Sequence, residues 1–405
     1  MITHSYYEED SRVRREAEAL VAAGREVDVI GLRRPEMPAR DTVAGVAVCR
    51  LPVERQQGSP VLGYLFEYAA FFWRAAFAAA RMHRRRRYGL VQVHTIPDPL
   101  VFAAAPLRWA GARVLIDLHE AMPDFFRSRF PHVSVRPVIA ALGLAERASV
   151  AFADHALTVN DALAERLIRL GLPESKVTVV VNSPSRELFH PGTDRDPAVR
   201  LPYRAFMADG TLRLVYAGAL TPLYEVGVAI EAIALLRFGD GPPSGRSAPV
   251  TWPVRLDVYG RGDAQPALVE LAERLGVADC VAFHGRIPLE EVPARLAEAD
   301  AGLAPTRRDA YTDLSLSTKV FECAAMDRPV LASRLPTVER YFPDGTLFYF
   351  EPGDAASLAE AMRRLVEEPG AREEAVRRAA ERVADHSWER EAARYVSVVE
   401  AFVRD

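Results

Sequence analysis

Short apolar runs alternate with longer segments of helical periodicity along almost the whole chain, and this alternation most limits the folds open to it. Apolar strands joined through helices are typical of a parallel sheet that is covered on both faces. In the first half, the predicted strands cover residues 27–32, 46–51, 90–94, 113–118, 155–159 and 177–181. In the second half, they cover residues 212–217, 255–259, 280–283, 301–303 and 329–332. We therefore predict an α/β protein with two successive doubly wound domains.

Local signals set the limits of the elements and domains. A first helix is predicted over residues 12–23, because Asp10 or Ser11 can cap its start and Gly24 its end. The proline-containing segment 189–209 reads as an interdomain linker, and residues 238–253 as a loop insertion rich in Gly, Pro and Ser. Only three residues precede the first turn, so either the first strand is short or the chain starts upstream.

Composition excludes several classes of function. A length of 405 residues suggests two or three domains, and a net charge of −4 gives no broad field for nucleic acid. Cys49, Cys280 and Cys323 are too widely spaced for a zinc site, so we expect reduced thiols in a cytoplasmic protein. The N-terminus has no signal-peptide pattern. Among 51 basic residues, only Lys176 and Lys319 are lysines, which suggests that a retained lysine has a chemical role. Lys176 stands at a predicted turn and is read as incidental.

The most apolar segment, residues 61–82, is followed directly by five arginines within residues 81–87. Glu67 and Arg74 interrupt it, which argues against a membrane-spanning helix. An apolar, aromatic helix with a basic end can lie on an anionic membrane surface, at the inner face of the cell membrane. The alternative is a core helix whose last arginines complement the helix dipole.

The segment at 311–330, YTDLSLSTKVFECAAMDRPV, carries the most chemical information. Ser317 is a good N-cap, so a helix starts here with free N–H groups that favour phosphate. Lys319 adds a compact charge suited to a diphosphate, and Glu322 shares its face of the helix. A carboxylate there can accept both hydroxyls of a ribose. Asp327 stands where a C′ glycine is common, a position that aspartate tolerates.

This segment resembles the donor-site helix of the retaining GT-B glycosyltransferases of family 4 (glycosyl transferases group 1), and the resemblance extends over about 390 residues. The segments that carry it in the first half are DSRVRREA (10–17), VHTIPD (93–98), IDLHE (116–120) and VNSP (181–184). In the second half they are VYAGAL (215–220), VYGRG (258–262), FHGRIP (283–288), ADAGLAP (299–305) and HSWE (386–389). The resemblance implies two Rossmann-like doubly wound domains that face a central cleft.

The resemblance assigns boundaries and roles. It implies an acceptor domain at residues 1–190, a donor domain at 208–386, and a last helix at 387–405 that packs back on the first domain. The donor diphosphate would be bound by Lys319, Arg261, Gly218 and Ser317. The nucleoside would be bound by Glu322, Ile287 and Arg286. His119 and Asp313 are the catalytic candidates near the donor sugar, and His94, Glu120 and Tyr7 lie on the acceptor side.

The implied reaction is front-face transfer of a sugar from a nucleotide-diphosphate sugar, with no metal and no further cofactor. Two features depart from the family pattern. Leu314 stands where many members carry a first glutamate, with Asp313 next to it, and the stretch LTPLYEVG (220–227) lacks the usual arginine–lysine pair. A saccharide, a lipid-linked sugar or a natural-product aglycone stays open as the acceptor. A nucleotide-sugar epimerase or hydrolase and a non-catalytic nucleotide-sugar-binding partner stay open as alternative functions.

Overall fold

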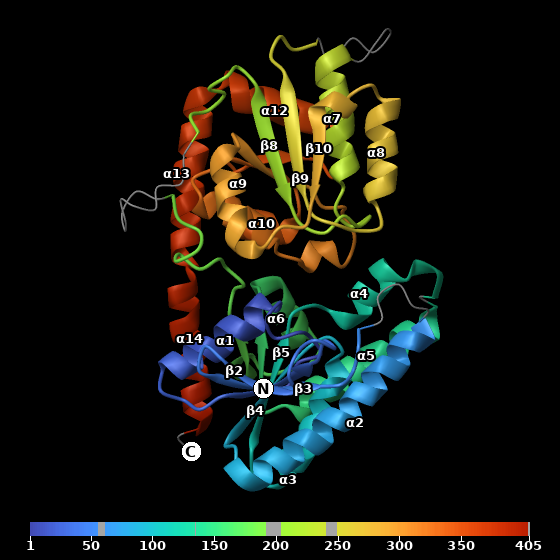
Figure 1. The fold of residues 1–405 in the computed structure, drawn as a ribbon, viewed down its shortest axis with the longest axis vertical. Coiled ribbons are helices and arrows are strands. Elements are labelled where there is room, and N and C mark those ends of the chain that lie inside the picture. The colour runs from blue at the N-terminus through green and yellow to red at the C-terminus, as the bar shows by residue number, and fades with distance from the viewer. Residues whose placement is uncertain (56–60, 134, 192–203, 240–248, 404–405) are drawn as a thin grey trace. The chain divides into compact units, whose positions relative to one another are not determined.

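The computed structural model describes residues 1–55, 61–133, 135–191, 204–239 and 249–403. The chain divides into two compact units, which are described separately (Figure 1). Unit 1 contains Met1–Asn182 and Arg390–Asp405, and unit 2 contains Ser183–Glu389. The unit boundary thus falls before the segment 189–209 that we read as a linker. Most of that segment, and most of the predicted insertion at 238–253, lies outside the described residues.

Unit 1 is built on a largely parallel sheet. Its strands are β1 (Asp28–Leu32), β2 (Arg40–Val43), β3 (Val46–Leu51), β4 (Leu90–His94), β5 (Arg113–Leu118), β6 (His155–Thr158) and β7 (Val177–Val179). They form the orders β1-β3-β2 and β4-β5-β6-β7. Ile2 pairs with Ile30 on one side and with Val93 on the other, so the short first strand lies between β1 and β4. The strand order therefore reverses at Ile2, as in a doubly wound sheet.

Helices cover this sheet. They are α1 (Ser11–Ala22), α2 (Val61–Arg86), α3 (Ala105–Trp109), α4 (Met122–Arg129), α5 (Arg136–Phe152), α6 (Asp161–Arg169) and α14 (Trp388–Val403), with 3-10 turns η1 (Asp98–Ala104), η2 (Pro131–Val133) and η3 (Glu174–Lys176). Asp10 caps α1 by accepting a hydrogen bond of 3.2 Å from the Val13 N–H. The core includes Phe71 from α2, Val93 from β4 and Ile116 from β5.

Unit 2 has a six-stranded parallel sheet of order β10-β9-β8-β11-β12-β13. Its strands are β8 (Leu212–Ala217), β9 (Val254–Tyr259), β10 (Val281–Gly285), β11 (Ala301–Ala304), β12 (Val330–Ser333) and β13 (Phe348–Phe350). The order reverses between β8 and β11, which makes the carboxyl ends of these two strands a topological switch point. Ligands of doubly wound sheets bind at such points.

The elements between these strands are α7 (Val226–Phe238), α8 (Gln265–Arg274), α9 (Val292–Glu298), α10 (Thr318–Ala325), α11 (Pro336–Tyr341), α12 (Ala355–Glu367) and α13 (Pro369–Asp385), with the 3-10 turns η4 (Ala278–Cys280), η5 (Leu289–Glu291) and η6 (Thr312–Leu314). In Figure 1, α7 and α8 run along one side of β8, β9 and β10. The predicted C′ position of Asp327 is confirmed by its φ of 50°. All three cysteines are free thiols.

Candidate functional site

Two glycine turns at the switch point of unit 2 pack directly against each other. The Leu220 N–H donates to the carbonyl oxygen of Arg261 at 3.0 Å, which joins the turn after β8 to the turn after β9. A Cβ at Gly260 would lie 1.8 Å from the carbonyl oxygen of Gly218, and one at Gly262 would lie 2.0 Å from that of Leu220. Both positions therefore require glycine, because any side chain would push the two turns apart.

The side chain of Lys319 lies against this pair of turns. A Cβ at Gly218 would lie 2.3 Å from the Lys319 Cε, so glycine at 218 makes room for the lysine. The Lys319 Nζ is 3.8 Å from the centre of the Tyr224 ring and 5.5 Å from that of Tyr216, as in cation–π contacts. Burial alone would lower the pKa of Lys319, but Tyr224, Tyr216 and Glu322 outweigh it and raise that pKa. The side chain is therefore an ammonium at neutral pH.

Helix α10 presents Lys319 from its first turn. Val320, Phe321 and Cys323 are buried, and a Cβ at Gly302 of β11 would lie 2.1 Å from the Cys323 Sγ, so the helix lies close against the sheet. Ser317 is the N-cap residue, and its side chain makes no capping hydrogen bond to the helix. The first N–H groups of α10 therefore offer donors beside the ammonium. Glu322 follows one turn later and is half-buried.

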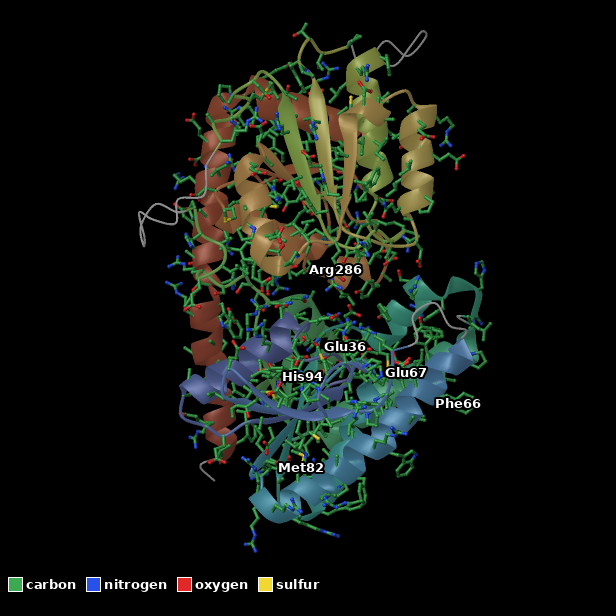
Figure 2. All side chains as sticks on the ribbon, viewed as in Figure 1. Glu36, Phe66, Glu67, Met82, His94 and Arg286 are labelled. Carbon is green, nitrogen blue, oxygen red and sulfur yellow. The ribbon has the colours of Figure 1, made fainter. Side chains whose placement is uncertain are left out.

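Arg261 follows β9 and is exposed, with its Nε 3.7 Å from the Cβ that Gly285 would carry. Within the described part of the chain, neither Arg261 nor Lys319 forms an ion pair with a carboxylate. Arg286 and Ile287 follow β10, exposed and half-buried respectively, and Figure 2 shows Arg286 beyond the carboxyl ends of the strands of this unit. Asp313 lies in η6 and accepts a 3.2 Å hydrogen bond from the Arg308 Nε.

In unit 1, strand ends bring two histidines and an aspartate together. The Asp117 Oδ2 is 2.9 Å from the His119 Nε2 and 3.0 Å from the His94 Nδ1. Asp117 lies in β5, His94 ends β4, and His119 comes directly after β5. His94 is 1% exposed, whereas the His119 side chain is 22% exposed. His94 was expected on the acceptor side, and its burial favours a supporting contact within the cluster.

A buried arginine fixes the charge of this cluster. The Arg12 Nε donates to the Asp117 Oδ2 and its Nη2 to the Asp117 Oδ1, both at 2.8 Å. Burial alone would raise the pKa of Asp117, but Arg12, His119 and His94 hold it well below its usual range. Burial alone would lower the pKa of His119, but the Asp117 charge and hydrogen bond outweigh it, and that pKa is raised.

The other acceptor-side candidates lie in different surroundings. Tyr7 is 1% exposed, and its buried hydroxyl has no hydrogen-bond partner among the described residues. Glu120 follows His119 and is half-buried. His4 precedes Tyr7 in the same segment, and its Nε2 is 3.0 Å from the Glu67 Oε1 of α2. Burial and the charge of Arg55 lower the pKa of His4 to about 3, so this histidine is neutral.

The cluster of His94, Asp117 and His119 brings three potential metal ligands close together. Its chemistry does not fit a bound cation, because both oxygens of Asp117 already accept hydrogen bonds from the guanidinium of Arg12. A metal ion on Asp117 would meet this positive charge directly. The donor set therefore suits an ion pair that orients His119.

Sequence reasoning missed several residues of the clusters in both units. Arg12 and Glu16 stand four residues apart on the buried face of α1, and two charged residues on an apolar face were a usable signal. Tyr216 and Tyr224 gave no such signal, since aromatic residues near a strand end are ordinary core residues. Their contact with Lys319 depends on how the turn after β8 folds.

Two family descriptions together match most of the chain. Residues 10–183 match "Glycosyl transferase 4-like domain", and residues 211–368 match "Glycosyl transferases group 1". D-inositol 3-phosphate glycosyltransferase from Thermomonospora curvata is 27% identical over 367 residues, which cover 88% of this chain and 82% of that enzyme.

Solved structures of other proteins share the fold of this chain over nearly its full length. Sucrose-phosphate synthase from Thermosynechococcus elongatus has a TM-score of 0.75 at 19% identity, covering 99% of this chain and 98% of its own. HepE from Anabaena in complex with UDP-glucose has a TM-score of 0.70 at 14% identity, and the match covers 99% of this chain and 98% of the HepE chain. These likenesses show that the two α/β units follow a known two-domain fold.

Proposed function

We propose that this chain, which belongs to the group 1 glycosyltransferases of the GT-B fold, transfers a sugar from a nucleotide-diphosphate sugar to an acceptor hydroxyl with retention of configuration. The observation that carries the proposal is the Lys319 ammonium, which lies against the glycine turns with no carboxylate partner in the described residues. A half-buried cation that forms no ion pair with a carboxylate favours an anionic ligand. The UDP-glucose bound to HepE supports a nucleotide-diphosphate sugar as that ligand.

We assign the donor contacts as follows. Lys319, Arg261 and the first N–H groups of α10 bind the diphosphate, and Gly218 and Ser317 let the turn and helix start approach it. Glu322 accepts the ribose hydroxyls, and the backbone around Arg286 and Ile287 contacts the base. Asp313, which stands beside Leu314 in place of the family glutamate, binds a sugar hydroxyl in exchange for its contact with Arg308.

In the proposed step, the bond from the anomeric carbon to the diphosphate oxygen breaks and a bond to the acceptor oxygen forms on the same face. The acceptor proton passes to the leaving diphosphate, so charge on that group is the main quantity to stabilise. Lys319 and Arg261 supply this stabilisation without a metal ion or further cofactor. His119 holds its Nε2 proton toward Asp117, which leaves Nδ1 to contact the donor sugar or the acceptor.

Product analysis tests this function. We would incubate the enzyme, with and without EDTA, with UDP-, GDP- and ADP-sugars and with saccharide, lipid-linked and inositol phosphate acceptors. The proposal predicts free nucleoside diphosphate and a new glycoside of unchanged anomeric configuration by NMR. Sugar release without acceptor would favour a hydrolase, and an isomerised donor would favour an epimerase. Tight donor binding without turnover would favour a non-catalytic partner.

We also propose that unit 1 contacts an anionic membrane surface through α2. The inner face of α2 packs Phe71 and Ala75 into the core, but Phe66, Trp73 and Phe77 are 76%, 71% and 72% exposed. These three residues recur at helical spacing and form one stripe along α2. Figure 2 shows the Phe66 side chain pointing away from the ribbon. The stripe leads to the exposed arginines Arg81, Arg84 and Arg85, whose charge complements anionic lipid.

No helix in the described residues is long and apolar enough to span a membrane. Co-sedimentation with vesicles tests the proposed surface contact. Binding to phosphatidylglycerol-containing vesicles should exceed binding to pure phosphatidylcholine and fall in Trp73→Ser. Phe238→Ser, which removes an exposed aromatic of unit 2, is the matched control. Equal binding to both vesicle types, or an equal effect of the control, would contradict the contact.

A further inference from the structure

A continuous series of buried polar contacts leads from α14 to His119. The Tyr395 Oη of α14 donates to the Gln92 Oε1 of β4 at 2.6 Å. The Gln92 Nε2 in turn donates to the Glu16 Oε2 of α1 at 2.6 Å. The Glu16 Oε1 lies 3.1 Å from the Arg12 Nη2. Arg12 then binds both oxygens of Asp117, the residue that holds His119.

The members of this series are buried, so each polar group depends on its neighbour in the series for a hydrogen-bond partner. Its first five members, Tyr395, Gln92, Glu16, Arg12 and Asp117, are at most 3% exposed. Buried polar groups that lose their partners cost free energy, because no water replaces the lost hydrogen bond. A change at one end of such a network therefore alters the partners along it. His119 is the member at the solvent end of the series.

Glu16 competes with Asp117 for the same guanidinium. Arg12 lies between the two carboxyl groups, with its Nη2 2.8 Å from the Asp117 Oδ1 and 3.1 Å from the Glu16 Oε1. Gln92 keeps the Glu16 carboxylate turned toward Arg12 by donating to its other oxygen, and Tyr395 fixes which end of the Gln92 amide faces Glu16. Burial raises the pKa of Glu16 and the Arg12 charge opposes this rise, so how much of the Arg12 charge acts on Asp117 depends on the charge that Glu16 carries.

We propose that Glu16 and Tyr395 are positioning residues, through which the C-terminal helix α14 sets the orientation and proton affinity of His119. The role that His119 plays in transfer rests on the proposed function, but its coupling to α14 does not. The charged and titratable groups that act on His119 are Asp117 and His94 within its cluster, Arg12 and Glu16 on α1, and the α1 cap Asp10.

The test is an NMR titration of the histidines in the full-length protein, with His119 assigned from the spectrum of His119→Asn. With Gln at 16, the whole guanidinium charge acts on Asp117 and its neighbours. We expect Glu16→Gln to lower the pKa of His119 by about one pH unit, and the isosteric Tyr395→Phe by about half as much. The double variant should match Glu16→Gln alone, because Tyr395 acts only through the Glu16 carboxylate.

Glu146→Gln is the matched control. Glu146 is also a buried carboxylate of unit 1 that binds an arginine, with the Arg166 Nη2 donating to the Glu146 Oε2 at 2.9 Å. An unchanged His119 titration in Glu16→Gln and Tyr395→Phe, or an equal shift in Glu146→Gln, would overturn the inference. In an active enzyme, the pH profile of kcat should shift with the same sign, with KM for the donor unchanged. If no donor is turned over, the proposed function fails while the titration still decides this coupling.

Discussion

Each unit carries a cation at the carboxyl ends of its strands, and the two cations are held in opposite ways. In unit 1, Arg12 is buried and bound to both oxygens of Asp117, with Glu16 at 3.1 Å. In unit 2, Lys319 contacts two tyrosine rings and, among the described residues, no carboxylate. A fully paired charge can only orient its neighbours, whereas an unpaired ammonium can bind an anion from outside. The paired Arg12 therefore fits a positioning role, and the unpaired Lys319 fits the proposed binding of the donor diphosphate.

Breaking the ion pair between Arg12 and Asp117 should cause the largest effect, a loss of folding stability. Asp117→Asn leaves Arg12 buried with one carboxylate fewer, and we expect a loss of about 3–5 kcal/mol in the free energy of unfolding at pH 7. Urea denaturation measures this loss. Glu374→Gln, which breaks an exposed pair with Arg377 on α13, is the control that should change little.

The stabilisation that Asp117 provides should depend on pH in a defined direction. The folded protein holds the pKa of Asp117 well below its usual range, so its stabilisation is present above about pH 4 and is lost as the pH falls toward the folded value. The difference between wild type and Asp117→Asn should therefore be largest near neutral pH and shrink in acid. A difference that grows in acid would contradict the ion pair.

The next largest effect should come from the glycine turns that support the proposed donor site. In Gly260→Ala, the new Cβ would meet the Gly218 carbonyl oxygen at 1.8 Å, so the turns must separate and Lys319 must shift. We expect donor turnover to fall about 100-fold or more. Gly143→Ala in α5, where a Cβ meets no atom within 4 Å, should keep wild-type turnover. Equal kinetics in both variants would show that the turns do not shape the donor site.

The smallest of these effects should come from the proposed nucleoside contact. Glu322→Gln removes the charge that we propose accepts the ribose hydroxyls, and we expect donor kcat/KM to fall about tenfold. The preference for a ribonucleotide donor over its 2′-deoxy analogue should fall as well. If Glu322→Gln kept the full ribose preference, the nucleoside would have to bind elsewhere.

The fold was largely predictable from sequence because buried parallel strands are apolar throughout. Predicted residues 46–51, 90–94, 113–118 and 212–217 coincide with β3, β4, β5 and β8, and the other predicted strands differ by one or two residues at an end. Two strands were missed for physical reasons. β2 is an exposed, antiparallel edge strand with the polar sequence RDTV. β13 is buried but only three residues long.

The candidate site was predictable only in part. The helix start with Lys319 and Glu322 is local, so spacing alone could place them on one face. The contacts of Arg12 with Asp117 join residues 105 positions apart, which no local pattern encodes. Likewise, the need for glycine at 260 and 262 follows from the turn after β8, about forty residues earlier in the chain.

Titration calorimetry of donor nucleotides tests the central claim most directly, since the chain contains only two lysines and each serves as the control for the other. Lys319 is half-buried beside the glycine turns, whereas Lys176 is exposed in η3. The nucleoside diphosphate should bind wild type and Lys176→Ala alike, and Lys319→Ala about tenfold or more weakly. The uncharged nucleoside should not distinguish the three proteins. Unchanged diphosphate affinity in Lys319→Ala would contradict the claim that this ammonium is held for the donor.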